Sequence, residues 1–442
     1  MHANRQGRDA AFAALVLGML MASLDTNVVV AALPAIAADL GGADAVGGVT
    51  AAYLLAVAVA TPVHGSLGDR WGRRRTFAGS AVVFAVGSLA CALAPDVPAL
   101  VAFRAVQGLG GSGLIVAAVA GLAELFDRTE LVRRQGWLTA VFAVSSIGGA
   151  PLGGLLAATA GWRSVFVVNL PLCAVALLLG ARTVPGARRV SRTGFDWRGA
   201  LLVAVAGGGI VVLGSAGAIA RDLLRASVVV LLVGIATVAF VRVERRAAAP
   251  LVPPRLFADA GLARAIGVTF LSGVALFGSF TYVPLALGAA PAATGLLLLP
   301  MSAGQLVVTS GFAAFARRFP RLTAWGRLGL ALGVAGLLAT AAIPLLPPGG
   351  IRLAVIVAGL ACSGASLGLS MQVYALLAQS WAPVDVLGSA MATLTFTRQI
   401  GGSLGIALFG LLSGPAVFVA AAGVLLAGWI FAPRAAHDRV VR

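Results

Sequence analysis

The chain has 442 residues, of which 60% are hydrophobic and 11% are charged, and its mean hydropathy is +1.00. A soluble domain of this length cannot cover so much apolar surface, so the composition predicts a membrane protein whose surface is covered by lipid. The formal net charge of +17 comes from arginines that recur in short groups between apolar segments. That distribution is typical of membrane proteins and argues against a nucleic-acid-binding domain.

Fourteen apolar segments of the chain are long enough to cross a bilayer, which takes about 20 residues. The predicted spans are residues 11–33, 46–66, 76–94, 98–122, 136–159, 163–181, 197–217, 223–243, 262–287, 292–315, 324–346, 351–379, 387–412 and 414–433. The predicted fold is therefore an all-α polytopic membrane protein with 14 transmembrane helices.

The arginines predict the orientation of these spans. If the N-terminus is cytoplasmic, only Arg163, Arg221, Arg225 and Arg352 fall in the outside loops, and the other loop arginines face the cytoplasm. Cytoplasmic loops of membrane proteins carry an excess of arginine and lysine. The sequence therefore predicts an even number of spans with both termini in the cytoplasm.

The longest connections lie near residues 182–197 and 244–261, which predicts three parts. These are an N-terminal six-helix bundle (1–182), a linker with an inserted pair of helices (183–261) and a C-terminal six-helix bundle (262–442). Two six-helix halves with a site near the midplane are a common transporter plan.

The short loops leave no room for a soluble catalytic domain. No phosphate-binding loop, hydrolase motif or metal-ligand cluster is present, and each cysteine lies alone in an apolar segment, so we predict neither an enzyme nor a metal site.

Three ionisable residues lie well inside predicted spans: Asp25, Arg104 and Arg398. A charge at the bilayer centre costs at least about 2.5–3.5 kcal/mol on insertion scales, so such residues usually face a cavity or a partner. Structural pairing, or a side chain that reaches the interface, is the alternative for each. Asp25 is the only acid of the three, and we predict that it carries the proton in coupled transport, with Arg104 beside it.

Polar and soft side chains near these charges are candidates for lining a transport cavity. Gln107 and Gly108 share a helical face with Arg104, and Gln399 follows Arg398 in TRQIGGSLG. An arginine above a glycine stripe in each half is compatible with internal repetition. The full predicted cavity set is Thr26, Asn27, Gln107, Gly108, Phe277, Phe280, Met371, Phe396, Arg398 and Gln399. Its aromatic members suit flat hydrophobic compounds, although packing against helices or lipid explains each of them equally well.

The segment GSLGDRWGRRR, residues 65–75, resembles the signature loop between the second and third helices of the major facilitator superfamily. LDTNVVVAALPAI, FRAVQGLGGS, GWRSVFVVNLP and TRQIGGSLGIAL resemble further motifs of its fourteen-span drug:proton antiporter branch. Val30 departs from the first of these motifs, where asparagine is usual. The resemblance extends from residue 24 to about residue 408.

This resemblance implies alternating access driven by proton uptake, without a cofactor other than the proton gradient. It also implies a conformational latch formed by Gly65, Asp69, Arg70, Gly72 and Arg73. The fifth helix of antiporters usually contains GPxxGG, whereas this chain has GGAPLGG. Pro151 comes one residue late, but Gly149, Gly153 and Gly154 remain, so we expect a helix-packing motif there.

The predicted function is proton-coupled export of hydrophobic drugs or antibiotic-like small molecules. A carrier for a polar metabolite or a lipid is the alternative within transport. An embedded enzyme or a receptor is the alternative outside it, and the lack of a paired catalytic constellation and of an appended domain argues against both.

The arginine-only basic residues and high alanine content suggest a GC-rich bacterial genome, which predicts the cytoplasmic membrane. The predicted partners are the small-molecule substrate, protons and the lipid bilayer, with no nucleic acid, and the protein is predicted to be a monomer.

Overall fold

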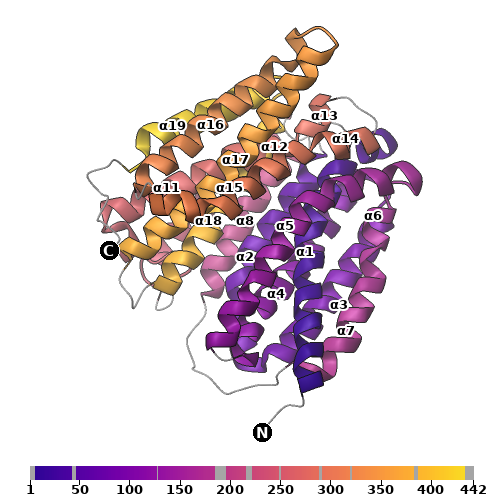
Figure 1. The fold of residues 1–442 in the computed structure, drawn as a ribbon, viewed down its shortest axis with the longest axis vertical. Coiled ribbons are helices and arrows are strands. Elements are labelled where there is room, and N and C mark those ends of the chain that lie inside the picture. Colours follow the sequence, from indigo (N-terminus) through magenta and orange to yellow (C-terminus); the bar gives the residue numbers. More distant parts are fainter. Residues whose placement is uncertain are drawn as a thin grey trace. The chain divides into compact units, whose positions relative to one another are not determined.

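The computed structural model describes residues 5–41, 46–126, 128–184, 196–215, 222–247, 250–287, 291–318, 321–382 and 387–433. All regular structure in these ranges is helical. The chain divides into two compact units (Figure 1). Unit 1 consists of Met1–Ala200 with Ala289–Leu296, and unit 2 consists of Leu201–Gly288 with Leu297–Arg442.

Unit 1 is built from seven consecutive helices and most of the short helix α14 (Pro291–Leu297). The seven are α1 (Arg5–Leu40), α2 (Gly47–Trp71), α3 (Arg73–Ala92), α4 (Val97–Leu125), α5 (Arg128–Thr159), α6 (Ser164–Val167) and α7 (Asn169–Thr183). Only Val168 separates α6 from α7, so these two form one interrupted helix. The buried core of unit 1 lies between α1, α2, α3 and α4, where large side chains such as Phe77 and Phe84 are fully enclosed.

Unit 2 holds the remaining elements. They are most of α8 (Trp197–Ser215), α10 (Leu223–Glu244), η1 (Pro254–Phe257), α11 (Ala260–Ser272), η2 (Gly273–Phe277), α12 (Gly278–Phe280), α13 (Val283–Leu287), α15 (Leu299–Arg318), α16 (Leu322–Ala342), η3 (Ile343–Leu345), α17 (Gly350–Trp381), α18 (Leu387–Phe409) and α19 (Ala416–Phe431). The turn η2 is π-helical and continues α11 without a break.

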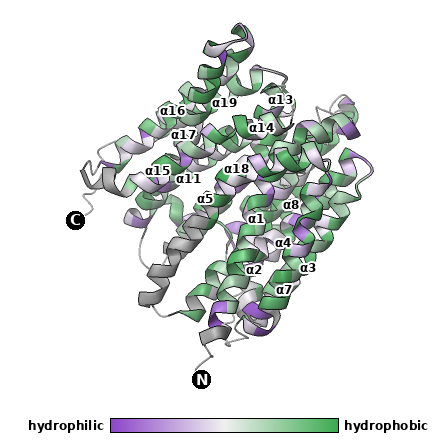
Figure 2. Cartoon of the chain, turned by 45° about the vertical axis from the view of Figure 1, so that its right-hand side comes forward, coloured by the Kyte–Doolittle hydropathy of each residue, from purple (hydrophilic) through white to green (hydrophobic). Residues whose placement is uncertain are grey.

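Nine helical segments in the described part of the chain are long and apolar enough to cross a membrane. Four shorter apolar helices, Val144–Thr159, Ser164–Gly180, Trp197–Leu213 and Ala416–Phe431, lie where the sequence predicts further spans. Figure 2 shows hydrophobic residues along most of the length of these helices. On α10 most of the described side chains are exposed, including Leu224, Val230 and Leu231. The architecture is that of a multi-pass membrane protein, and the number of fourteen spans stays a prediction.

The charged segment at 65–75 is not a loop but a one-residue hinge. Helix α2 continues to Trp71 and α3 begins at Arg73, so Gly72 alone connects them. Gly72 has φ +86° and ψ 148°, a conformation that only glycine adopts without strain. Its amide donates to the carbonyl of Gly68 (3.0 Å), and its own carbonyl accepts from the Thr76 hydroxyl (3.2 Å). Glycine at this position therefore permits the abrupt reversal between the two helices.

Replacing Gly72 with alanine is expected to lower the free energy of unfolding by about 1–3 kcal/mol, because the β-carbon forces a strained backbone. SDS-induced unfolding of the purified protein measures this change. Gly65→Ala is the matched control, since Gly65 is helical and a β-carbon there has nothing within 4 Å. The control is expected to stabilise α2 by up to about 1 kcal/mol. Equal effects of the two substitutions would contradict the hinge assignment.

Candidate functional site

Asp25 and Arg104 form a fully buried ion pair at the centre of unit 1. Asp25 lies in the middle of α1 and is 2% exposed, and Arg104 lies on α4 and is 0% exposed. The Nη1 atom of Arg104 donates to Oδ2 of Asp25. The structure thus brings together the first two of the three charges that the sequence places inside spans.

Two amides complete the coordination of the Asp25 carboxylate. Its Oδ1 atom accepts from Nε2 of Gln107 (2.8 Å) and from Nδ2 of Asn169 (3.2 Å), the first residue of α7. Both amides also donate to the hydroxyl of Ser88 on α3, at 2.8 Å from Gln107 and 3.4 Å from Asn169. The Oε1 atom of Gln107 accepts from Arg104 Nη1 (2.6 Å). These contacts make one connected network from α1, α3, α4 and α7.

Helix α2 supplies the remaining contacts of Arg104. The Nε atom of Arg104 donates to the carbonyl of Val49 (3.2 Å), and its guanidinium carbon lies 4.2 Å from the ring centre of Tyr53. Tyr53 is held in place because its hydroxyl donates to the carbonyl of Ala22 on α1 (3.0 Å). A cation above an aromatic face is stabilised by the ring quadrupole, especially away from water. The Nη2 atom of Arg104 is buried and has no hydrogen-bond partner among the described residues.

Glycines on α3 and α4 let the helices approach closely enough to build this network. A β-carbon on Gly87 would lie 2.6 Å from the Cα atom of Gln107. One on Gly108 would lie 2.7 Å from the carbonyl oxygen of Tyr53, and one on Gly110 would lie 2.3 Å from the amide nitrogen of Phe84. Real side chains do not tolerate such distances, so helix contacts of this kind need small residues. The glycines of VQGLGG thus position Arg104 and Gln107.

A second set of polar contacts, made by Asp39 near the end of α1, orients α6 and α7. The carboxylate of Asp39 accepts from Trp162 Nε1 (2.9 Å) and from Arg163 Nη1 (2.7 Å). Arg163 and Asp39 are about half exposed, so solvent screens their ion pair and it contributes little to stability. Its effect is geometric: it holds the chain just before Asn169 against the helix that carries Asp25.

The network around Asp25 is enclosed by protein. All its side chains are buried, so water does not reach the carboxylate in this state. Protonating Asp25 would remove its negative charge and leave the Arg104 guanidinium uncompensated in a medium of low polarity, which is strongly unfavourable. The pairing of Arg104 therefore depends on the negative charge of the Asp25 carboxylate.

The other predicted residues of unit 1 lie around this centre. Asn27 donates from Nδ2 to the carbonyl of Ser145 on α5 (3.2 Å), and Thr26 is half-buried beside it. The predicted packing motif contacts the same stretch of α1. A β-carbon on Gly149 would lie 2.6 Å from Cβ of Asn27, and one on Gly153 would lie 2.2 Å from the Val28 carbonyl oxygen. Pro151 is half-buried and Gly154 is buried on the same helix.

The predicted latch is only partly described. Arg73 donates from Nη1 to the carbonyl of Gly65 (3.5 Å) and lies over Gly68, where a β-carbon would be 2.2 Å from the same nitrogen. Arg73 therefore folds back onto the end of α2. The side chains of Asp69 and Arg70 lie outside the described residues.

Unit 2 holds the other predicted cavity residues. Phe280 is buried on α12, whereas Phe277 on η2 and Phe396 on α18 are half-buried. The sulfur of Met371 on α17 lies 3.9 Å from Nε2 of Gln305. Arg398 and Gln399 are half-buried on α18. No described cavity gathers these side chains, and whether they line a transport path stays a prediction.

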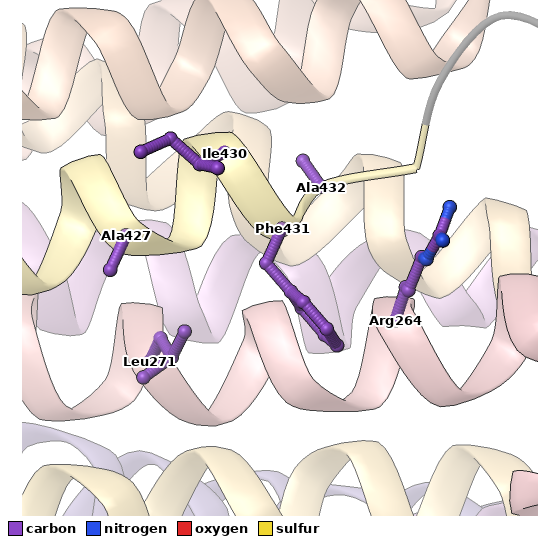
Figure 3. Close-up of a pocket in the computed structure, with 6 residues that line it drawn as sticks. All are labelled: Arg264, Leu271, Ala427, Ile430, Phe431 and Ala432. Carbon is purple, nitrogen blue, oxygen red and sulfur yellow. The ribbon is translucent and has the colours of Figure 1, made fainter.

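One groove of unit 2 lies elsewhere, between α11 and α19 (Figure 3). Its volume is about 600 Å³, and its lining is apolar except for Arg264. Phe431 extends from α19 towards α11, where it packs against Gly267. The groove contains none of the predicted site residues, so we place the candidate site at Asp25 on chemical grounds rather than by cavity size.

Tyr53, Ser88 and Asn169 are the network residues absent from the predicted site. Each is a polar side chain inside or at the edge of an apolar segment, and this is the only feature of the sequence that points to a role for it. A lone hydroxyl or amide in a span can also satisfy itself on the backbone of its own helix. Their role becomes visible only once α2, α3 and α7 are placed around α1.

Residues 15–406 match the sequence profile of the Major Facilitator Superfamily. The chain belongs to this family. The match covers most of the chain, including every residue of the Asp25 network. The signature segment at 65–75 thus carried the correct resemblance, although it adopts a hinge rather than a loop.

Several bacterial members of the family are similar in sequence. An uncharacterized MFS-type transporter of Mycobacterium tuberculosis is 38% identical over 412 residues, which are 92% of this chain and 59% of that protein. This chain therefore spans about three-fifths of the length of that relative. A multidrug resistance protein B homolog of the same species is 32% identical, with 90% of this chain and 74% of that protein covered. The multidrug transporter protein MdtP of Bacillus subtilis is 27% identical, with 93% and 77% covered.

Solved structures of major facilitator proteins share the fold. A peptide transporter in complex with alafosfalin superposes with a TM-score of 0.71 at 14% identity, with 98% of this chain and 97% of that chain covered. The inward-open xylose transporter XylE of E. coli gives a TM-score of 0.65 at 17% identity, with 96% and 95% covered. At these identities the likeness concerns the fold and not the transported compound.

Proposed function

We propose that this protein is a proton-coupled antiporter that exports hydrophobic, drug-like small molecules across the bacterial cytoplasmic membrane. One observation carries the proposal: the buried carboxylate of Asp25, which is paired with Arg104 and held by two amides. Among the described residues, Asp25 is the only acid deep within a candidate span. One carboxylate can hold one proton, and the guanidinium of Arg104 can neutralise the carboxylate when the proton is absent. These two properties suit proton coupling.

The proposed cycle follows from the competition between a proton and Arg104 for the same carboxylate. When a change of conformation opens the network to the outside, water carries a proton to Asp25 and the ion pair separates. Arg104 then keeps its contacts with Gln107 and the Val49 carbonyl. When the site next faces the cytoplasm, the proton leaves and Arg104 pairs with Asp25 again. In the proposed cycle the deprotonated site returns to the outside with the compound bound, so that proton entry drives export of the compound.

Export of drug-like compounds is supported by relatives that are named multidrug transporters or multidrug resistance proteins. The same site would equally drive a carrier for a polar metabolite or a lipid, which is the second candidate. We propose that both termini are cytoplasmic, that the protein works as a monomer, and that the proton gradient is its only energy source.

The test uses purified protein in liposomes that contain the pH-sensitive dye pyranine. Ethidium, Hoechst 33342, novobiocin and nalidixic acid are added one at a time, and proton movement is recorded. The wild type is expected to move protons with at least one compound, whereas Asp25→Asn moves none; size-exclusion chromatography checks that the variant compared is folded. Proton flux that persists in Asp25→Asn would refute the coupling role of Asp25. If no compound moves protons in the wild type, drug export is wrong and the second candidate takes its place.

A further inference from the structure

Arg398 differs from the other charges that lie deep within described helices. Asp25 and Arg104 neutralise each other in unit 1. Arg398 lies on α18 in unit 2, eleven residues from both the first residue, Leu387, and the last, Phe409. At 1.5 Å per residue this is about 16 Å from each end, which is half the thickness of a bilayer core. Within the predicted span 387–412, this position places Arg398 near the midplane.

This charge has no partner in the described part of the chain. Arg398 makes neither a hydrogen bond nor an ion pair there, and its side chain is only half-buried. A guanidinium carries five N–H donors and keeps its positive charge. Hydrocarbon is a strongly unfavourable surrounding for such a group, so charged residues in spans face a water-filled cavity or a partner. A guanidinium without a partner in the described part of the chain can bind a polar ligand.

Two further features occur at the same level of unit 2. The Oε1 atom of the adjacent Gln399 is buried without a hydrogen-bond partner. The π-helical turn η2 begins at Gly273, where a β-carbon would lie 2.3 Å from the carbonyl oxygen of Arg398. Single π-turns inside helices are frequent at functional sites. An unpaired cation, an unsatisfied amide and an irregular helix thus coincide next to α18.

We propose that Arg398 binds a negatively charged group, such as a carboxylate, on the transported compound. An arginine fork matches the two oxygens of a carboxylate. This inference rests on the proposed transport function and narrows its substrates to hydrophobic compounds with one acidic group. A cationic drug has no free acid to pair with in the described spans, because Asp25 is already engaged.

Matched fluorescent probes test the charge preference. Dansyl-phenylalanine carries one carboxylate, and its primary amide is a neutral analogue of nearly the same shape. Binding to the purified full-length protein is measured in detergent without a pH gradient, so the result does not depend on proton coupling. The wild type is expected to bind the acid about tenfold more tightly than the amide, or better, as is usual for a hydrogen bond to a charged group. Equal affinity, or no binding of the acid, would overturn the inference.

Variants then assign the preference to Arg398. Arg398→Gln is expected to bring the affinities for acid and amide within about twofold, and Arg398→Lys is expected to keep part of the difference, because lysine retains the charge without the fork. Arg327→Gln is the control, since Arg327 lies on α16 over the ring of Trp429 and is expected to keep the full preference. If Arg398→Gln does not fold, the Lys variant decides: an acid preference identical to that of the wild type would overturn the bidentate assignment. A loss of the preference in Arg327→Gln would also overturn it.

Discussion

Arg104→Leu is expected to lower the free energy of unfolding by about 3–5 kcal/mol, because it leaves the buried carboxylate of Asp25 without its counter-charge. Asp25 is 2% exposed, so water cannot replace the lost partner in the folded protein. Leucine also removes the hydrogen bonds to Gln107 and to the Val49 carbonyl. SDS-induced unfolding, followed by tryptophan fluorescence, measures the change.

The double variant Asp25→Asn with Arg104→Leu separates charge from packing. It removes both ions, so most of the stability is expected to return, since replacing a buried ion pair altogether is often nearly neutral. A coupling energy from the full cycle of four proteins then reports the pair alone. If the double variant is as unstable as Arg104→Leu, the loss comes from packing around Arg104 and not from an unpaired carboxylate.

Gly87→Val is expected to cost about 3 kcal/mol or more, the upper end of the range for overpacked cores. A β-carbon at Gly87 would lie 2.6 Å from the backbone of Gln107, and rigid backbone cannot move aside as a flexible side chain does. The helices α3 and α4 must therefore separate. Because Gln107 and Ser88 lie at this contact, we expect proton-coupled transport to fail together with stability.

Gly79→Val is the matched control on the same helix. Gly79 is exposed, and a β-carbon there has nothing within 4 Å, so we expect a change below about 0.5 kcal/mol, as for other surface substitutions. Thermal unfolding and the pyranine assay are run on both variants. Equal behaviour of the two valine variants would show that α3 and α4 tolerate separation and that the close contact does not position the network.

The sequence predicts which residues belong to the cavity and to the latch, but it does not predict which side chains contact one another. Arg104 and Arg398 look alike in sequence, since each precedes a glycine stripe and lies near a glutamine. The structure gives them different surroundings: Arg104 has a buried carboxylate, and Arg398 has no partner in the described part of the chain. Whether an arginine is paired depends on residues distant in the sequence, so local pattern cannot decide it.

The sequence by itself determined the class of the protein. Hydropathy and helix length are local properties, so composition and segment length identify membrane spans, and the motif at 65–75 identifies the family. Tertiary structure alone decided that Gln107 and Asn169 join Arg104 on the carboxylate of Asp25, and that Tyr53 and Ser88 complete the network. These contacts depend on how closely five helices pack. The short distances between these helices depend on glycines. Which of these glycines is required can be seen only when the position of the facing helix is known.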